Sequence, residues 1–383
     1  MNNRDTVLIV NPNSNSGLTG KNWESIYQTL CESFGKDLEV AFTKKSGDGT
    51  ELSRAYLKKG FKNIIPIGGD GMINEVANGF FEENNKINYN FDIKVQDDNN
   101  DYLSLMPLKP INPEAIMTVL PSGTRNVLIQ SLDLPNDFKE CCTALGNCKT
   151  FKKIDVIFAL VTDSEDSSKN VMRIFLNAAE IGIGAEIISK AKEIRNKVNN
   201  RLLSTIAGLI TTVPTFKSDV CEITIGLNKE SGIDDKVITK MTMGIIANGR
   251  FLGGGVQAAT NASINDWLLD IVIIRNSDGL GIVNEIISLK IEDQSKSESG
   301  GGGVGGNNIY YTQSKNVSIA TTGDKNIIVT LDGEPAGILP AFFKIFPNYL
   351  NVRIWHFVYF GYFLAILSNG KYNYILIALQ LWF

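Results

Sequence analysis

Three short apolar runs, each followed by a turn rich in glycine, serine or asparagine, dominate the first 126 residues. The runs are TVLIV, NIIPI and IMTVL, and the turns that follow them are NPNSNSG (11–17), GGDGMIN (68–74) and PSGTRN (121–126). Apolar runs of this length are typical of parallel strands that are buried on both faces. Stretches with helical spacing and a further strand separate these runs, at 22–34, 38–42, 50–59 and 72–80. The alternation predicts a doubly wound α/β domain.

The three turns predict a binding site for phosphate groups. In an open α/β sheet, ligands bind at the carboxyl ends of the strands, where these turns lie. Glycine lets the backbone approach a phosphate and point its amides toward it, and a helix beginning near Met72 adds its positive end. Asp70 lies between two glycines of the second turn. A carboxylate beside phosphates needs a metal or a proton, which indicates a role with Mg²⁺ or in catalysis.

The second half of the chain changes character. Short β-branched runs separated by turn residues predict a largely antiparallel β domain, with one long helical stretch at about 186–211. The predicted strands are 154–161, 171–177, 219–227, 237–247, 268–275, 316–320, 326–331 and 341–346. The sequence therefore divides into an α/β domain at 1–133, which a final segment at 339–354 rejoins, and a β-rich domain at 134–338. Two polar or low-complexity segments, 82–112 and 291–308, are interpreted as insertions.

Composition narrows the function. A chain of 383 residues favours two domains, and its net charge of −4 gives no basic excess for binding nucleic acid. The single histidine, His356, lies in an aromatic stretch near the C-terminus, which argues against histidine-based triads, zinc sites and proton relays. The five cysteines form no CxxC pair and are interpreted as free thiols. No signal peptide is recognisable, so a cytoplasmic location is expected.

The C-terminal segment 355–383 is apolar and aromatic. It consists of two runs split by SNGKYN, and each run is shorter than the roughly 20 residues that span a bilayer. Three interpretations stay open: an anchor at the membrane interface, a segment that packs on the core or on a partner, and an unrepresentative C-terminus. Peripheral association with a membrane and a homodimer are both compatible with this pattern.

Taken together, six motifs resemble the diacylglycerol kinase catalytic superfamily, which includes sphingosine, ceramide and bacterial lipid kinases. The GGDG turn is also similar, more distantly, to that of NAD kinases. The matching segments are LIVNPNSNSG (8–17), GGDGMINEVANG (68–79), LPSGTRN (120–126), FLNAAEIGIG (175–184), ANGRFLGGG (247–255) and LDGEPAGILP (331–340). The resemblance implies a doubly wound α/β domain of NAD kinase and diacylglycerol kinase type, a C-terminal antiparallel β-sandwich, and ATP in the cleft between them.

The resemblance also implies an activity and its residues. The activity is ATP-dependent phosphorylation of a lipid hydroxyl at a membrane surface, with diacylglycerol converted to phosphatidic acid. Asp332 and Glu334 match the family's DGE, whose Glu is taken as the base, and Asp70 would act near the phosphates and Mg²⁺. A structural Mg²⁺ would map onto Ser263, Asp266 and Leu268. The implied ATP contacts are Asn11, Thr43, Gly68, Gly69, Asp70, Gly71, Met72, Ile73, Asn74, Gly123 and Thr124.

Several alternatives stay open. The acceptor could instead be sphingosine or ceramide, and Asp155 is a candidate carboxylate for an amine-bearing acceptor. A non-catalytic nucleotide or lipid sensor belongs to a different class, and an NAD kinase matches fewer of the motifs. The presence of Asp70, Asp332 and Glu334 argues against the sensor, whereas two departures from the family pattern keep it open. Met72 stands where Thr is common, and Trp267 stands where Gly follows the metal-binding Asp, which makes that turn harder to form.

Overall fold

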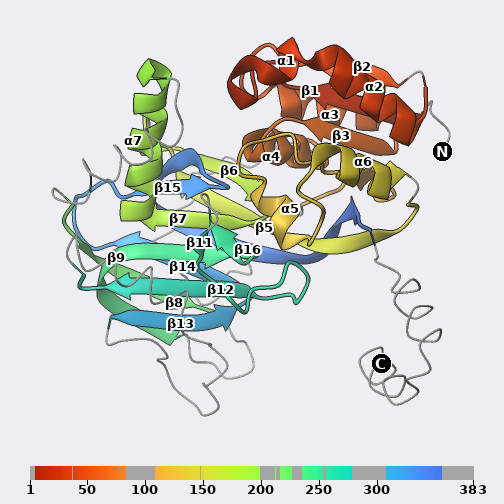
Figure 1. Ribbon diagram of the computed structural model, residues 1–383. Coiled ribbons are helices and arrows are strands. Elements are labelled where there is room, and N and C mark those ends of the chain that lie inside the picture. The colour runs from red at the N-terminus through yellow and green to blue at the C-terminus, as the bar shows by residue number, and fades with distance from the viewer. Residues whose placement is uncertain are drawn as a thin grey trace, which may run out of the picture.

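The computed structural model describes residues 5–36, 38–82, 108–146, 148–198, 212, 216–226, 235–252, 256–277 and 308–355. Most of the two predicted insertions and of the hydrophobic C-terminal segment, including His356, lies outside these residues. In Figure 1 the N-terminal helices and strands form one part of the molecule, and a β-rich part lies beside it. One helix, α7 (Ile183–Val198), projects from the β-rich part.

The N-terminal part is built on a parallel sheet with strand order β2-β1-β3-β4. Every residue of β1 is buried, which explains why its sequence is a continuous apolar run. The predicted alternation of strands and helices is confirmed. The strands are β1 (Thr6–Val10), β2 (Glu39–Phe42), β3 (Asn63–Ile67) and β4 (Ile116–Met117). The helices are α1 (Leu18–Lys21), α2 (Trp23–Phe34), α3 (Asp48–Lys58), α4 (Asp70–Asn78), α5 (Val127–Ser131) and α6 (Phe138–Gly146), with a 3₁₀ turn at Asn15–Gly17.

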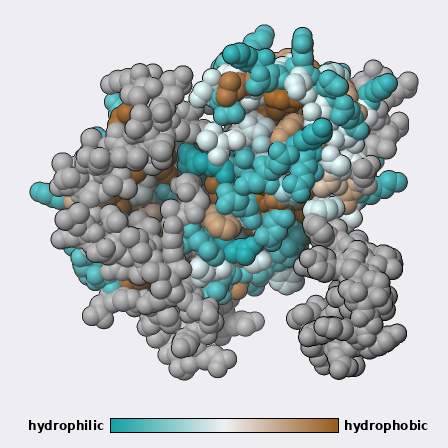
Figure 2. All heavy atoms as spheres, viewed as in Figure 1, coloured by the Kyte–Doolittle hydropathy of each residue, from teal (hydrophilic) through white to brown (hydrophobic). Residues whose placement is uncertain are grey.

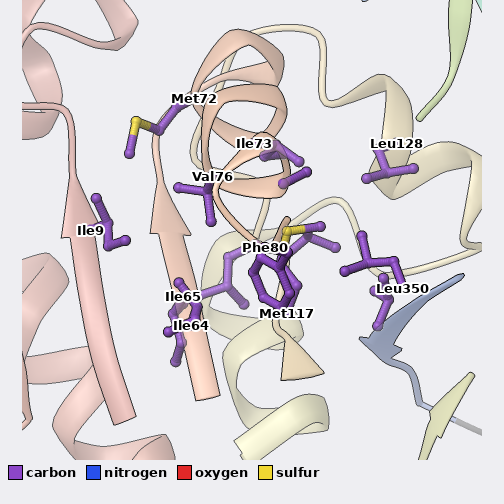
Figure 3. Packing of buried hydrophobic residues seen from close by; sticks show 14 of the residues in the cluster. Ile9, Ile64, Ile65, Met72, Ile73, Val76, Phe80, Met117, Leu128 and Leu350 are labelled. Atoms are coloured by element: carbon purple, nitrogen blue, oxygen red, sulfur yellow. The ribbon is translucent and has the colours of Figure 1, made fainter. Parts of the chain in front are cut away.

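Helix α4 carries the second glycine turn into the core. Ile73, Val76 and Ala77 are buried on it, and Phe80 follows just after its end. Figure 3 shows Ile73 and Val76 on α4 and Phe80 after it, gathered with Ile65 of β3 and Met117 of β4. Burying side chains of this size contributes about 1.5–3 kcal/mol each, so the packing fixes α4 and with it the start of the helix at Asp70.

The β-rich part closes on itself. Strands β16, β14, β8, β9, β7 and β15 pair antiparallel in that order, and β15 returns to β16 as a hairpin. This ring of hydrogen-bonded strands encloses an apolar core. The strands of this part are β5 (Phe151–Thr162), β6 (Asn170–Phe175), β7 (Ala178–Gly182), β8 (Asp219–Ile225), β9 (Asp235–Ala247), β10 (Phe251–Leu252), β11 (Val256–Gln257), β12 (Leu269–Arg275), β13 (Ile309–Ser314), β14 (Asn316–Thr321), β15 (Ile328–Leu331) and β16 (Glu334–Arg353).

Strand β16 joins the two parts. Its 20 residues begin in the β-rich ring and end beside β4, where Asn351 and Val352 pair parallel with Ile116 and Met117. The segment expected to rejoin the N-terminal domain therefore adds a strand to the parallel sheet. Helix α6, which follows residue 133, packs against α2 of the N-terminal part. The boundary at residue 133 stays a prediction.

All five cysteines lie in the described part of the chain and are free thiols, as expected. Burial raises the pKa of Cys141, Cys142 and Cys221 to about 12. Thiols that stay protonated at neutral pH are poor nucleophiles and poor metal ligands, so these three are structural.

Two features of the described residues bear on contact with a membrane: the character of the helices and the distribution of apolar side chains on the surface. Among the described residues, no helix combines the length and the apolar character needed to cross a membrane. Where Figure 2 is not grey, hydrophilic residues predominate on the visible face and hydrophobic residues occur in small, separate groups. Scattered groups of this kind are normal on a protein surface.

A buried carboxyl group on β12 gives the fold a pH-dependent stability. Asp270 accepts hydrogen bonds from Tyr311 and Gln313 on β13, and burial raises its pKa to about 6. Its folded pKa lies above its unfolded value, so its contribution is complete below pH 4 and is lost as the pH rises through about 6. We expect the unfolding free energy of the wild type, relative to Asp270→Asn, to fall by about 2 kcal/mol from pH 4 to pH 7 in denaturant titrations. A pH-independent difference would contradict this.

Candidate active site

One cavity of about 660 Å³ is lined by all three turns of the N-terminal sheet and by residues of the β-rich part. It brings together most of the residues that the sequence predicted for ATP and for catalysis. These are Asn11, Thr43, Gly69, Asp70, Gly71, Met72, Ile73, Gly123, Thr124, Asp332 and Glu334. Gly68 and Asn74 are not among the lining residues, and their roles in the structure are described below.

The second and third turns touch each other. A Cβ atom on Gly123 would lie 2.5 Å from Cα of Gly69, so position 123 has room only for glycine. Ser122 links the turns further, because its hydroxyl accepts a hydrogen bond from the amide of Gly68 and donates one to the Gly68 carbonyl. Gly68 therefore holds the two turns together rather than lining the cavity.

Asp70 is the first residue of α4. Its Oδ1 atom accepts a hydrogen bond of 2.8 Å from the backbone amide of Val127, at the start of α5. The carboxylate thus connects the second turn to the helix that follows the third turn. Its position on the cavity wall gives it oxygen atoms of the kind that Mg²⁺ prefers.

The DGE sequence forms the tight turn between β15 and β16. Asp332 and Gly333 both have positive φ angles, 49° and 78°, and Leu331 pairs with Glu334 across the turn. Asp-Gly with two positive φ angles is the sequence and geometry of a two-residue β-hairpin. The hairpin places Glu334 on the cavity wall, where its Oε1 atom would lie 3.2 Å from a Cβ atom on Gly71. Glu334 therefore lies against the second turn.

The carboxylate of Asp332 is fully engaged with the protein. Its two oxygens accept hydrogen bonds from the amides of Leu176, Asn177 and Ala178 and from Nδ2 of Asn74, at 2.8–3.2 Å. Burial raises the pKa of Asp332, against these four hydrogen bonds, which lower it. Asn74 is buried and orients Asp332 from α4. These hydrogen bonds give Asp332 a structural role, and its catalytic role stays a prediction.

Sequence reasoning missed a carboxylate that shapes the polar side of the cavity. Glu75 on α4 accepts hydrogen bonds from the amides of Gly47 and Gly49, both at 3.0 Å. It fastens the loop after β2 to α4, beside the exposed side chains of Lys44 and Lys45, which line the cavity. The position of Glu75 within the quoted GGDGMINEVANG motif was the available signal.

The other wall of the cavity is apolar. Ile183, Ile187 and Ile188 of α7 contribute to it, together with Met243 of β9 and Leu252 of β10. Glu180 of β7 also lines the cavity, although little of it is exposed to solvent. One cavity therefore combines glycine-rich turns and an apolar wall with carboxylates.

The three predicted ligands of a structural Mg²⁺ lie in one tight turn away from this cavity. The Ser263 carbonyl accepts a hydrogen bond from the Asp266 amide, and Asp266 Oδ1 accepts one from the Leu268 amide. Trp267 adopts a positive φ of 71° and is 52% exposed, so the turn forms despite the missing glycine. Within the described residues no group of three or more His, Cys, Asp or Glu side chains could hold a metal ion. The ligand set stays a prediction.

Asp155 is accounted for by this turn. Its Oδ2 atom accepts the Trp267 amide at 2.8 Å and its Oδ1 atom accepts the Asn348 amide at 2.7 Å. It is fully buried, burial raises its pKa, and it is not among the lining residues of the cavity. Asp155 is therefore no candidate for binding an amine on the acceptor.

Two family domains follow one another along the chain. "Diacylglycerol kinase catalytic domain" matches residues 5–159, and "YegS C-terminal NAD kinase beta sandwich-like domain" matches residues 177–354. The second match agrees with the β-rich part of the structure.

Curated relatives and solved structures agree with these domains. "Lipid kinase YegS" of Escherichia coli (strain K12) is 27% identical over 349 residues, covering 91% of this chain and 95% of that protein. "Probable lipid kinase YegS-like" of Klebsiella pneumoniae (strain 342) is 28% identical over 65% of this chain and 68% of its own. The crystal structure of "a putative diacylglycerol kinase" from Bacillus anthracis superposes with a TM-score of 0.61 at 21% identity, covering 91% and 96% of the two chains, and shows the same fold.

The expected architecture is therefore confirmed, with a doubly wound α/β domain followed by an antiparallel β-sandwich. Two family domains in series, and curated lipid kinases that match along most of the chain, establish that this protein belongs to the diacylglycerol kinase catalytic superfamily of lipid kinases.

Proposed function

We propose that this protein transfers the γ-phosphoryl group of ATP to the free hydroxyl of diacylglycerol at a membrane surface. The observation that carries the proposal is the composition of the cavity of about 660 Å³. Its polar wall is made of the turns around Gly69, Asp70 and Gly123, and its apolar wall includes Ile187 on α7. A polyphosphate and an acyl chain need these two kinds of surface, in one cavity, to react with each other.

The residues of the chain divide the work of phosphoryl transfer. Backbone amides of the glycine turns and the start of α4 hold the phosphates, and Lys44 and Lys45 supply positive charge. Asp70 would hold Mg²⁺, which neutralises phosphate charge when it is bound. Glu334 lies against Gly71 and would accept the proton of the acceptor hydroxyl as the bond to phosphorus forms. Such a reaction needs positioning and charge neutralisation, and no histidine.

The acceptor is the least constrained part of the proposal. The apolar wall fits acyl chains, and a neutral acceptor needs no dedicated counter-charge beside it. A sphingoid base is a second candidate, because the nearly buried Glu180 lines the same cavity and could pair with an ammonium group. Of the segment 355–383, which the sequence offers as a membrane anchor, only Trp355 lies in the described part of the chain.

One assay tests the proposal. Purified protein is incubated with labelled ATP, Mg²⁺ and micelles that contain diacylglycerol, monoacylglycerol, sphingosine or ceramide, with NAD in parallel. Label in phosphatidic acid is the expected result. Label in a sphingoid phosphate would favour the second candidate and point to Glu180. ATP binding with no labelled product from any acceptor would contradict catalysis and favour a sensor.

A further inference from the structure

The cavity holds a positively charged side chain to which neither the motifs nor the family match gives a role. Arg125 belongs to the third turn, PSGTRN, and lines the cavity. It is partly buried, and its guanidinium has no hydrogen bond or ion pair with any other residue that the structure describes. A guanidinium offers five N–H donors and stays charged at every physiological pH. A partly buried group of this kind without a protein partner is suited to an anionic ligand.

The backbone around Arg125 is fixed from both sides. The amide of Gly123 donates a hydrogen bond of 2.9 Å to Oδ1 of Asn126, which closes the turn around Arg125. The carbonyl of Arg125 accepts a hydrogen bond of 2.9 Å from Nε2 of Gln130 on α5. Asn126 itself adopts a positive φ of 51°. The turn is therefore held in one conformation and presents the guanidinium without a change in the backbone, which is the arrangement that electrostatic stabilisation requires.

Arg125 also lies beside the hairpin that carries Glu334. A Cβ atom on Gly333 would lie 3.6 Å from Nη1 of Arg125, and Glu334 is the next residue. The positive charge is thus next to the turn that presents the base, in a cavity that also contains the carboxylates of Asp70 and Asp332. A phosphoryl group that crosses this region meets several negative charges, so a cation there lowers the energy of its transfer.

The other cations of the cavity are placed differently. Nη2 of Arg173 donates to Oδ1 of Asn74 at 3.3 Å, so this guanidinium already takes part in the network around Asp332. Lys44 and Lys45 are exposed and lie on the loop after β2. Arg125 is the cation that lies next to the Asp332–Gly333 turn and has its donors available.

From this geometry we infer that Arg125 is a catalytic residue, which binds the transferring phosphoryl group and stabilises the charge that develops on its oxygens in the transition state. The inference rests on the proposed function, because it requires ATP-dependent phosphoryl transfer in this cavity. Bidentate contacts of the planar guanidinium with two phosphoryl oxygens would give both charge and orientation. A lysine at this position would keep the positive charge but lose the bidentate contact with two phosphoryl oxygens.

The test compares turnover with nucleotide binding in Arg125→Met and Arg125→Lys. We expect kcat to fall about 100-fold in Arg125→Met and about 10-fold in Arg125→Lys, while the Kd for MgADP, measured by calorimetry, changes less than threefold. With aluminium fluoride and dioctanoylglycerol present, the wild type should bind MgADP more tightly than it binds MgADP alone. Arg125→Met should lose this gain in affinity. Arg250→Met, which removes a surface arginine paired with Asp133, is the matched control and should retain wild-type turnover.

The outcomes separate this inference from the proposed function. If the wild type phosphorylates its acceptor and Arg125→Met retains kcat within threefold, Arg125 has no catalytic role while the kinase function stands. If MgADP affinity falls as much as kcat, Arg125 acts in ground-state binding and the inference is wrong. If the wild type itself produces no labelled lipid, the proposed function fails before Arg125 is tested. Thermal unfolding midpoints within 2 °C of the wild type show that the variants are folded.

Discussion

Replacing Glu334 by Gln is expected to lower kcat about 1000-fold while leaving the affinity for MgATP unchanged. The substitution preserves the size of the side chain on the hairpin turn, so the contact with Gly71 is retained. In the proposed mechanism it removes the atom that accepts the proton of the acceptor hydroxyl, and general-base catalysis contributes roughly 100-fold to 10,000-fold. Glu334 belongs to the hairpin, whereas the turns proposed to bind the nucleotide belong to the N-terminal part. The affinity for MgATP should therefore not change.

The measurement is a steady-state assay combined with calorimetric titration of MgATP. Glu114→Gln serves as the control, since Glu114 is exposed, pairs with Lys62 and lies outside the cavity. The control should retain wild-type turnover. A kcat for Glu334→Gln within threefold of the wild type would remove Glu334 from the mechanism. An equal loss of MgATP affinity and turnover would show that Glu334 contributes to nucleotide binding instead.

The N-terminal sheet could be predicted from the sequence because its strands are buried on both faces. Strands β1 and β3 begin and end at the residues that the apolar runs TVLIV and NIIPI indicated. Parallel strands of this kind carry a local signal, a continuous apolar run that ends at a turn. The glycine turns were visible for the same reason, since a strand end, a glycine pair and a helical repeat follow one another directly in the sequence.

The β-rich part carried a weaker signal. Strand β7 (Ala178–Gly182) was not recognised, because AAEIG is short and has small residues, and it follows β6 after only two residues. Strand β13, with the sequence IYYTQS, adjoins a low-complexity segment and was also missed. Strand β16 runs for 20 residues, although only 341–346 was predicted as a strand within it. Pairing with distant strands, which a local pattern does not encode, extends it.

The site shows the same division between local and long-range information. Asp70 and Glu334 were found through short motifs, yet the meeting of their turns depends on a contact between residues more than 250 positions apart. Ile183 lies in the quoted motif FLNAAEIGIG, but Ile187 and Ile188 belong to no motif, because the role of this apolar wall comes from the cavity that α7 borders. Arg125 was part of a quoted motif but passed without comment, since only the structure shows that its guanidinium has no partner among the described residues.

Replacing Asp332 by Ala is expected to lower the unfolding free energy by about 4 kcal/mol. The substitution leaves the amides of Leu176, Asn177 and Ala178 without their acceptor, and each unsatisfied buried donor costs about 1–3 kcal/mol. Ala also tolerates the positive φ at this position less well than Asp does. Denaturant titration measures the loss. A change below 1 kcal/mol would show that these hydrogen bonds do not stabilise the fold.

The variant Asp332→Asn separates positioning from folding. Asn keeps the shape and tolerates the left-handed conformation, but its amide group faces donors from Leu176 and Asn74. We expect a loss of about 2 kcal/mol in stability and a fall of about tenfold in kcat, with the KM for ATP unchanged. The reason for this split is that Asp332 orients the hairpin that carries Glu334, whereas the nucleotide turns are held by other contacts.

A double-mutant cycle then identifies the contact responsible. In Asn74→Asp/Asp332→Asn the amide and the carboxylate exchange places, so the hydrogen bond between them can form in the opposite direction. Because the two side chains touch, their effects should not add, and the double variant should regain about half of the kcat lost in Asp332→Asn. Additive losses in the double variant would contradict the positioning role. If kcat falls 1000-fold in Asp332→Asn and is not restored by Asn74→Asp, the Asp332 carboxylate itself takes part in the chemistry, and its four hydrogen bonds serve to hold it at the reacting atoms.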